Sequence, residues 1–330
     1  MAAKILIYGE TDEKHVSPST KEVLGIGRKL ADTLAAELVG VFIGERENEN
    51  VEEAISFGAD KVVVVENIEL RNYHPELYLS VMEKVCKAID PDILLMSQNF
   101  VGSDLAPRIA YRLAGSLTTD CVDLAIDPET KRLLCTKPIY GGIARAGYST
   151  ECRPQMATLR EKAFPLPEPD ETRKGEVIPF DTEIDFSTRK VKLIERVEEE
   201  DIASARLEHA EAIVCGGRGM GSLEAFRELE ELAQILGGAV AGTRPTCERG
   251  WLNPRLQVGL TGKKVAPKLY IAVGVSGAVQ HMAGIGSKCI VAINKDPDAN
   301  IFKEAHYGAV GDYNEILPSF KKKIKEIVEK

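Results

Sequence analysis

Short apolar runs alternate with amphipathic segments along the first third of the chain. The runs predict strands at residues 4–8, 39–43, 61–65 and 92–98, and the segments between them predict helices at about 19–38, 51–57, 75–89 and 103–113. Strict alternation of strand and helix indicates a parallel sheet with helices on both faces. We therefore expect a Rossmann-like α/β domain at the N-terminus.

Local polar residues suggest where two of these helices begin. Ser19 and Glu22 have the spacing of a capping box, in which hydroxyl and carboxylate each satisfy a free backbone N–H group. Loop 97–104 lies where a strand should end and a helix begin, which is where nucleotides bind in open α/β sheets. The loop has neither a Walker A lysine nor a GxGxxG sequence. A helix N-cap at Ser103 without a ligand is therefore the favoured interpretation.

The pattern changes after Cys121. Turn residues in DPETK (127–131) and GG (141–142) are flanked by alternating segments, which predicts antiparallel strands added to one edge or end of the sheet. Three prolines between residues 165 and 169 then punctuate a charged stretch that suits a connection. A further strand is predicted at 189–197.

A chain of 330 residues is long enough for two domains. We place the boundary within residues 190–210, near an acidic run, and predict domains at 1–195 and 196–330. In the second domain, residues 210–238 combine a buried strand, a glycine turn and an amphipathic helix, and three more strands follow. The predicted helix face contains Leu223, Phe226, Leu229, Ala233 and Leu236. The fold class is thus α/β, with a C-terminal doubly wound parallel sheet.

The glycine turn of this second domain resembles a dinucleotide fingerprint but departs from it. Gly217 and Gly219 fit the first two glycines, whereas Ser222 stands where the third would fall. Glycines still permit a close backbone approach, and a helix start still favours an anion. Arg218 gains nothing from the helix dipole. Two interpretations therefore remain open: Arg218 contacts an external anion or flavin, or it is simply solvated.

Polar residues gather at the predicted carboxyl ends of the C-terminal strands. They are Thr243, Arg244, Ser276, His281 and Asn294. Strand ends of this kind form the ligand crevice of a parallel α/β sheet. Ser276 has no evident aspartate–histidine partner, and no histidine–carboxylate cluster has metal spacing. The sequence therefore predicts a site that holds an anionic, hydrogen-bonding ligand, although a lone histidine such as His281 is more commonly structural.

Composition and charge narrow the classes of protein to which the chain can belong. The formal net charge is −9, which disfavours nonspecific nucleic-acid binding. We find no signal peptide, and no apolar run approaches the roughly 20 residues of a membrane span. Seven scattered cysteines without CxxC spacing argue against a zinc or iron–sulfur site and favour a reducing, cytoplasmic location.

Four segments of the second domain resemble the α subunit of electron transfer flavoproteins. They are GGRGM (216–220), GTRP (242–245), QVGLTGKKVAPKLY (257–270) and LYIAVGVSGAVQHMAGIGSKCIVAINKDPDANIF (269–302), in the same order as in that family. The resemblance is specific from about 210 to 320 and rests mainly on layout before residue 190. It implies FAD as the ligand of the C-terminal domain, with the N-terminal domain at a subunit interface.

The resemblance also implies roles for individual residues. Ser276, Gly277 and Gln280 would hold the pyrophosphate, and Asn294 and Asp312 would serve the adenosine, with Lys295 and Asp296 nearby. Arg218 would lie beside the cofactor, Thr261 at flavin N5, His281 at the O2 edge and Arg244 against the isoalloxazine. Thr243, Gln257, Val258, Gly259 and Gly274 complete the implied FAD-binding set.

The family works as an αβ heterodimer, which implies a β-subunit partner. Its members pass electrons from acyl-CoA dehydrogenases and similar enzymes to a quinone oxidoreductase, and a second branch bifurcates electrons from NADH to ferredoxin and another acceptor. GTRP and ERGWLNPRLQVGL (248–260) resemble the bifurcating or nitrogen-fixation-associated branch. Leu260 departs from the family pattern, because many members have glutamine there.

Two other function classes remain as alternatives. An NAD-dependent dehydrogenase would need an intact GxGxxG turn, which Ser222 interrupts. A nucleotide-binding sensor or scaffold would use loop 97–104 of the N-terminal domain.

Overall fold

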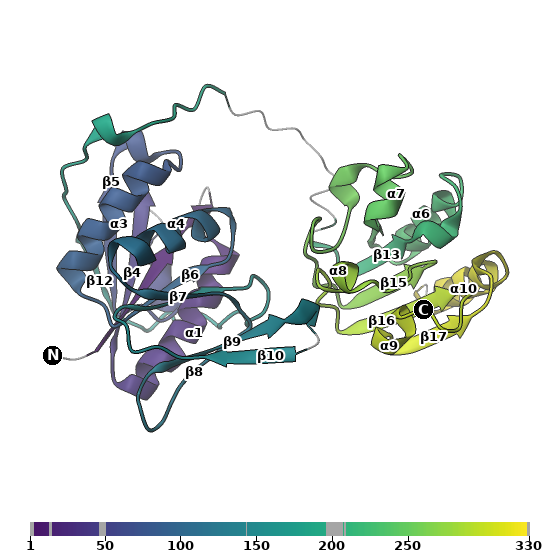
Figure 1. Cartoon of the computed structure of the whole chain (residues 1–330), viewed down its shortest axis with the longest axis horizontal. Helices are drawn as coiled ribbons and strands as arrows, with labels where there is room; N and C mark the ends of the chain where they lie inside the picture. Colours follow the sequence, from purple (N-terminus) through teal and green to yellow (C-terminus); the bar gives the residue numbers. More distant parts are fainter. Residues whose placement is uncertain are drawn as a thin grey trace. The chain divides into compact units, whose positions relative to one another are not determined.

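The computed structural model describes residues 3–12, 15–45, 51–142, 144–195, 207 and 209–328. The chain divides into two compact units, one built mainly from residues before 197 and the other mainly from residues after 196 (Figure 1). Each unit has its own parallel sheet.

The sheet of the N-terminal unit has seven parallel strands within the described residues, in the order β12-β5-β4-β1-β6-β11-β7. The strands are β1 (Lys4–Gly9), β4 (Glu37–Gly44), β5 (Lys61–Glu66), β6 (Ile93–Ser97), β7 (Ser116–Cys121), β11 (Gln155–Leu159) and β12 (Glu176–Pro179). The helices are α1 (Pro18–Leu34), α2 (Glu53–Ser56), α3 (Pro75–Ile89) and α4 (Phe100–Arg112), with short turns η1 (Ile68–Leu70) and η3 (Phe186–Thr188). A small ribbon pairs β2 (Thr11–Asp12) with β3 (His15–Val16).

Both faces of this sheet are buried, which explains the continuous apolar runs of its central strands. Ile5 and Ile7 of β1 belong to one hydrophobic cluster, and the alternate residues Leu6 and Tyr8 belong to another on the opposite face. The predicted parallel sheet is confirmed. The pattern did not reveal β7 and β11, which flank each other at one side of the sheet.

The antiparallel segment is also confirmed. Strands β8 (Asp123–Ile126), β9 (Leu133–Ile139) and β10 (Ala144–Tyr148) form a separate sheet in the order β10-β9-β8. Val122 N–H, which directly follows β7, donates to the Thr136 carbonyl at 2.8 Å. This small sheet is thus attached at the edge strand β7 of the parallel sheet.

The predicted capping box at Ser19 and Glu22 is wrong. Helix α1 begins two residues earlier, where the Ser17 side chain accepts the Thr20 N–H group. Glu22 is buried on the same helix, and its carboxylate accepts the Lys162 N–H group instead. The helix ends at Leu34 because Ala35 adopts a left-handed conformation with φ of 50°.

Two further local predictions fail. Helix α4 begins before Ser103, because Asn99 is its N-cap and accepts the Gly102 N–H group at 2.9 Å. Residues 189–195 form no strand, and the rest of the predicted strand 189–197 lies outside the described residues. One edge of the sheet is formed by β12, a strand that the sequence pattern does not predict.

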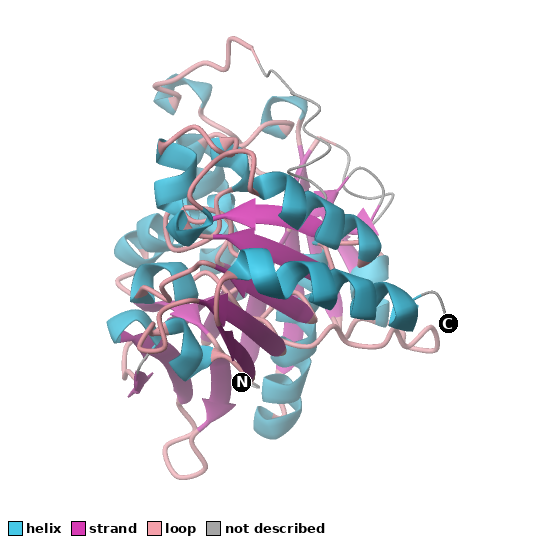
Figure 2. Cartoon of the chain, turned by 90° about the vertical axis from the view of Figure 1, so that its right-hand side faces the viewer, coloured by secondary structure: helices cyan, strands magenta, loops and turns pink. Residues whose placement is uncertain are grey.

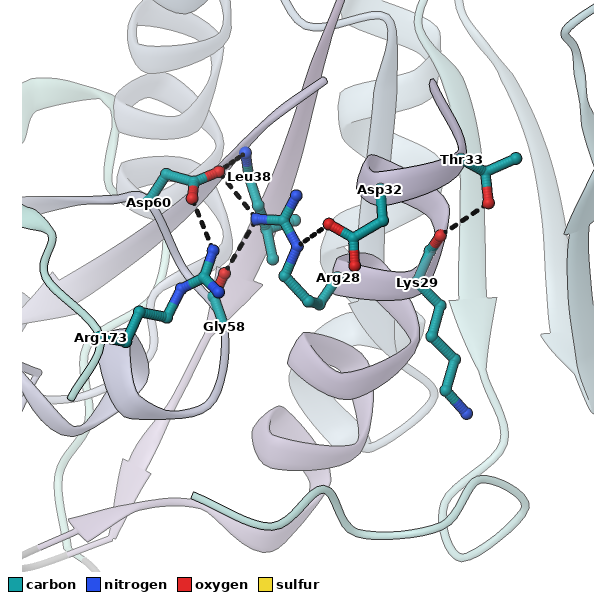
Figure 3. A network of polar contacts seen from close by, with 8 residues as sticks. All are labelled: Arg28, Lys29, Asp32, Thr33, Leu38, Gly58, Asp60 and Arg173. Carbon is teal, nitrogen blue, oxygen red and sulfur yellow. Dashed lines mark hydrogen bonds and ion pairs between the residues drawn. The ribbon is translucent and has the colours of Figure 1, made fainter. Parts of the chain in front are cut away.

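The carboxylate of Asp60 joins three segments of this unit (Figure 3). Its oxygens accept the Leu38 N–H group at 2.8 Å, Arg28 Nη1 at 2.8 Å and Arg173 Nη2 at 2.7 Å. Burial opposes the charge of this carboxylate, but the three hydrogen bonds outweigh it and lower the pKa of Asp60. The segment that leads into β12 is thereby fastened to α1 and β4.

Asp60→Asn should destabilise the chain by about 2 kcal/mol at pH 7, because hydrogen bonds to a charged acceptor are lost. Since the pKa of Asp60 is lowered, its contribution exists above the ordinary aspartate pKa and disappears as the pH falls through the lower folded value. The difference in free energy of unfolding between wild type and variant, measured with urea, should therefore shrink below about pH 4.

Asp32→Asn is the matched control, because Asp32 pairs with the same Arg28 but its side chain is 67% exposed. Its effect should stay below about 1 kcal/mol. Equal losses of stability in the two variants would contradict the role given to Asp60.

The sheet of the C-terminal unit has five parallel strands within the described residues, in the order β14-β13-β15-β16-β17. The strands are β13 (Ala212–Gly216), β14 (Ala239–Gly242), β15 (Leu269–Val273), β16 (Cys289–Asn294) and β17 (Tyr307–Val310). The helices are α6 (Phe226–Ile235), α7 (Arg244–Glu248), α8 (Val279–Met282), α9 (Ile301–Glu304) and α10 (Tyr313–Val328), with turns η4 (Arg218–Met220) and η5 (Pro254–Leu256).

Helices α6 and α10 lie side by side on one face of this sheet (Figure 2). Phe226 and Leu229 of α6 and Leu317 of α10 are buried in the same cluster with Ile271 of β15. The other face is covered by a second cluster that includes Val258 and Ile301. The predicted doubly wound α/β arrangement is confirmed. Because the strands are parallel, their carboxyl ends all lie at the same end of the sheet.

Candidate functional site

Two glycine turns meet at the carboxyl ends of the adjacent strands β13 and β15. Gly217 N–H donates to the Val273 carbonyl at 2.9 Å, and Gly219 N–H donates to the Gly274 carbonyl at 3.0 Å. A Cβ on Gly217 would lie 2.1 Å from the Gly274 oxygen. The close backbone approach expected from the glycines therefore occurs between the two turns of the protein.

The turn after β13 differs from the predicted one. Helix α6 starts only at Phe226, so Leu223 is 53% exposed instead of lying on the buried helix face. A short 3₁₀ turn follows the strand, and it exposes Arg218. Within the described part of the chain, the Arg218 side chain makes no hydrogen bond or ion pair. An unpaired guanidinium group therefore lies at the carboxyl end of β13.

The segment after β15 offers backbone donors. Ser276 is exposed and its carbonyl accepts the Ile301 N–H group at 3.1 Å, while Gly277 has φ of 77° and packs against Ile301. Helix α8 then begins at Val279. Among the described residues, no backbone carbonyl accepts the N–H groups of residues 278–280. These free N–H groups and the exposed Gln280 side chain are suited to an anionic ligand.

Asn294 connects two loops at the same edge. Its Nδ2 donates to the Val275 carbonyl at 2.9 Å and its Oδ1 accepts the Asp296 N–H group at 3.0 Å. The Asp312 carboxylate accepts the Asn314 N–H group at the start of α10, and Asp312 is exposed, as is Lys295. Asn294 thus shapes the crevice, whereas Lys295 and Asp312 expose charge beside it.

The end of β14 supplies Thr243 and Arg244. Thr243 is buried and its N–H donates to the Gly216 carbonyl at 3.1 Å, which joins this strand end to β13. The Arg244 side chain is 64% exposed and pairs with Glu248 at 2.7 Å. Arg244 therefore already has a carboxylate partner, in contrast to Arg218.

The loop of residues 257–262 is held by backbone bonds on two sides. Val258 N–H donates to the Gly242 carbonyl at 3.0 Å, and Leu260 N–H donates to the Gln280 carbonyl at 2.7 Å. At its tip, Gln257 Nε2 donates to Thr261 Oγ1 at 3.0 Å. Gly259 has φ of 139°, a conformation that favours glycine. The loop thus presents Thr261 and Leu260 to solvent directly beside α8.

His281 points inward. Its Nε2 lies 2.9 Å from the Tyr270 hydroxyl and its Nδ1 lies 3.0 Å from the Val258 carbonyl. Burial lowers the pKa of His281 from its ordinary value, although the bond to Val258 opposes this shift. Sequence reasoning missed Tyr270, because a tyrosine inside an apolar strand looks like core. The available signal was its hydroxyl, which requires a partner when buried.

The sixteen predicted FAD-binding residues all belong to the C-terminal unit. Hydrogen bonds link most of their segments, from β13 to β14 and β15, and from loop 257–262 to α8. The described residues contain no group of His, Cys, Asp or Glu side chains placed to hold a metal ion. The free guanidinium and free N–H groups at adjoining strand ends fit a diphosphate-containing ligand such as FAD.

Loop 97–104 of the N-terminal unit has its own polar partners. Asn99 Nδ2 donates to Glu10 Oε1 at 2.9 Å, and Gln98 bonds to both Thr158 and Ser103. Burial raises the pKa of Glu10, against the bond from Asn99. The Glu10 carboxyl group therefore lies beside the N-cap of α4, where its charge would repel a phosphate. This supports a helix cap without a ligand.

Comparison with known proteins also indicates FAD binding in the C-terminal unit. The electron transfer flavoprotein domain family matches residues 5–184, and the electron transfer flavoprotein FAD-binding domain family matches residues 206–286. The chain is 43% identical over 327 residues to the electron transfer flavoprotein subunit alpha of Thermoanaerobacterium thermosaccharolyticum, with 98% of each chain covered. It is 40% identical to the subunit of that name from Megasphaera elsdenii (98% and 96% covered) and to protein FixB of Azotobacter vinelandii (96% and 89% covered).

These matches define an electron-transfer protein that binds FAD. The chain belongs to the electron transfer flavoprotein α-subunit family, which includes relatives named FixB. The family resemblance and the FAD expectation are therefore confirmed, and an α subunit implies a β subunit as partner. Every helix among the described residues is too short or too polar to span a bilayer.

Gly217→Ala should destabilise the C-terminal unit by about 3 kcal/mol, because its new methyl group would overlap the Gly274 carbonyl. Gly217 has φ of −99°, which alanine adopts freely, so the cost comes from the contact alone. Urea unfolding and FAD content are the measurements. Gly286→Ala is the control, since its nearest neighbour would lie 3.5 Å away. Similar unfolding of the two variants would contradict this account of the turns.

Proposed function

We propose that the chain carries the FAD of an αβ electron transfer flavoprotein and passes electrons between flavin-dependent dehydrogenases and a quinone oxidoreductase or related acceptor. The observation that carries the proposal is the FAD-binding family match at residues 206–286, which includes the crevice formed by the ends of β13, β14 and β15. In this proposal the domain of residues 196–330 binds FAD and the domain of residues 1–195 contacts the β subunit.

The proposed pyrophosphate site lies after β15. Ser276, Gly277 and Gln280 would hold the diphosphate there, and the free N–H groups of residues 278–280 support this assignment. Asn294 and Asp312 would serve the adenosine side, with Lys295 and Asp296 beside them. Gly274 would keep the turn narrow enough for the diphosphate to approach the backbone.

The proposed flavin side uses the loop and the neighbouring strand ends. Thr261 would hydrogen-bond N5, and Gln257 supports it through the bond between their side chains. Val258 and Gly259 shape the loop, and Thr243 anchors the end of β14. Bound FAD supplies the capacity to store and release electrons, and the protein supplies position and electrostatics.

Arg218 and Arg244 differ in the charge they can offer. Arg244 shares its charge with Glu248, whereas Arg218 has no partner among the described side chains. An arginine stays protonated at any working pH. We therefore assign Arg218 as the main fixed cation that favours the negatively charged form of bound FAD.

Arg218→Gln should lower the midpoint potential of bound FAD by roughly 60 mV, which corresponds to about 1.4 kcal/mol for one electron. Arg227→Gln is the control, because it removes an equal charge from the exposed face of α6. Spectroelectrochemical titration of the αβ complex gives both values. An unchanged potential in Arg218→Gln would refute the assignment.

Electron bifurcation with NADH and ferredoxin is the second candidate, which the sequences GTRP and ERGWLNPRLQVGL favour. An NAD-dependent dehydrogenase and a nucleotide sensor are not favoured, given the family. All seven cysteines are free thiols, which supports the proposal of a reducing, cytoplasmic location.

The deciding measurement is the FAD content of the complex co-expressed with its β subunit, read as absorbance after denaturation and followed by NADH titration. We expect bound FAD in every heterodimer. Two FAD bleached by NADH would favour the bifurcating form, and one FAD without a response would favour the dehydrogenase-fed carrier. A colourless complex that FAD cannot reconstitute would exclude both.

A further inference from the structure

Three polar side chains form a buried row behind loop 257–262. Cys215 of β13 and Tyr270 of β15 are both fully buried, and His281 of α8 is 7% exposed. The Tyr270 hydroxyl lies 2.9 Å from His281 Nε2, and Cys215 Sγ lies 4.0 Å from the same nitrogen. The row connects two central strands to the helix that follows the proposed pyrophosphate turn.

The direction of these hydrogen bonds follows from one fixed acceptor. The Val258 carbonyl can only accept, so Nδ1 of His281 must carry the proton that bridges the 3.0 Å between them. In a neutral imidazole Nε2 is then an acceptor, and the Tyr270 hydroxyl must donate to it. The Tyr270 oxygen can in turn accept from the Cys215 thiol, which stays protonated because burial raises the pKa of Cys215 to about 12.

We propose that Tyr270 is a positioning residue of the FAD site, where it holds His281 as the uncharged Nδ1–H tautomer. This inference rests on the proposed function, because it assigns Tyr270 to the FAD-binding crevice. Tyr270 acts through His281 and through the position of α8.

Protonation of His281 would disturb the whole row. Nε2 would become a donor, and the Tyr270 hydrogen would need another acceptor among buried side chains, such as the weakly accepting Cys215 sulfur. Among the described residues, the titratable side chains that contact the imidazole are Tyr270 and Cys215. Cys247 of α7 acts electrostatically on Cys215. Positive charge for the flavin then comes from the arginines and not from His281.

The same contacts fix the loop that carries Thr261. Val258, which accepts from His281, donates its N–H to the end of β14, and Leu260 N–H donates to the carbonyl of Gln280 in α8. Tyr270 therefore connects α8 and loop 257–262 to the centre of the sheet. Loss of its hydroxyl should loosen both segments of the crevice together.

Tyr270→Phe tests the proposal in the full chain with ¹⁵N-labelled histidine. Long-range ¹H–¹⁵N spectra report which nitrogen is protonated, and His281→Gln identifies the signals. In wild type at pH 6 and pH 7 we expect a protonated Nδ1 and an unprotonated Nε2. In Tyr270→Phe the Nε2 signal should move downfield to the position of a free acceptor. The control is Tyr307→Phe, since Tyr307 is 68% exposed on β17, and it should leave the His281 signals unchanged.

The αβ complex provides the second readout. Tyr270→Phe should weaken FAD binding about fivefold to tenfold, which corresponds to the loss of one buried hydrogen bond. Tyr307→Phe should bind FAD as wild type does. A downfield shift of Nε2 together with weaker binding supports the positioning role, because a change in packing alone would not move one ring nitrogen.

Three results would overturn the proposal: a protonated Nε2 in wild type at pH 7, an unmoved Nε2 signal in Tyr270→Phe, or equal FAD affinity in the two proteins. Absence of FAD from the wild-type complex, with the expected tautomer present, would instead identify the proposed function as the failure. The positioning role would fall with it, and the hydrogen-bonded row would remain a structural feature.

Discussion

The contact between the glycine turns after β13 and β15 determines the geometry of the C-terminal crevice. Because Gly217 and Gly219 donate to the backbone of Val273 and Gly274, the two strand ends are held at backbone distance. The segment after β13 leads directly to the exposed Arg218, and the segment after β15 leads to α8. The contact between the turns therefore keeps the exposed guanidinium and the free N–H groups of residues 278–280 on two joined segments.

The layers of the fold could be predicted from the sequence because each sheet is buried on both faces. Continuous apolar strands and regular helices leave a strong pattern, and β1, α3 and β5 have almost the expected bounds. Caps and connections were less predictable because several polar residues competed for each role. Ser17 and Asn99 replaced Ser19 and Ser103 as helix caps, and β12 formed where no strand was predicted.

The candidate site was predictable in its location and less so in its contacts. Polar residues after buried strands identified the crevice, and the family resemblance identified FAD. The sequence could not show that Glu248 pairs with Arg244 or that His281 faces Tyr270, because both depend on side-chain directions. The difference matters chemically: the two arginines are unequal as cations, and the histidine is a buried acceptor.

Loop 257–262 obtains its shape from main-chain bonds of Val258 and Leu260, while the Leu260 side chain is 57% exposed. The side chain at this position therefore contributes little to the folding of the loop. A change of side chain at position 260 therefore alters the surface beside Thr261 without a penalty in main-chain geometry. The shape of the loop and the chemistry of its exposed tip are thus set by different atoms, so that the tip can change while the loop keeps its fold.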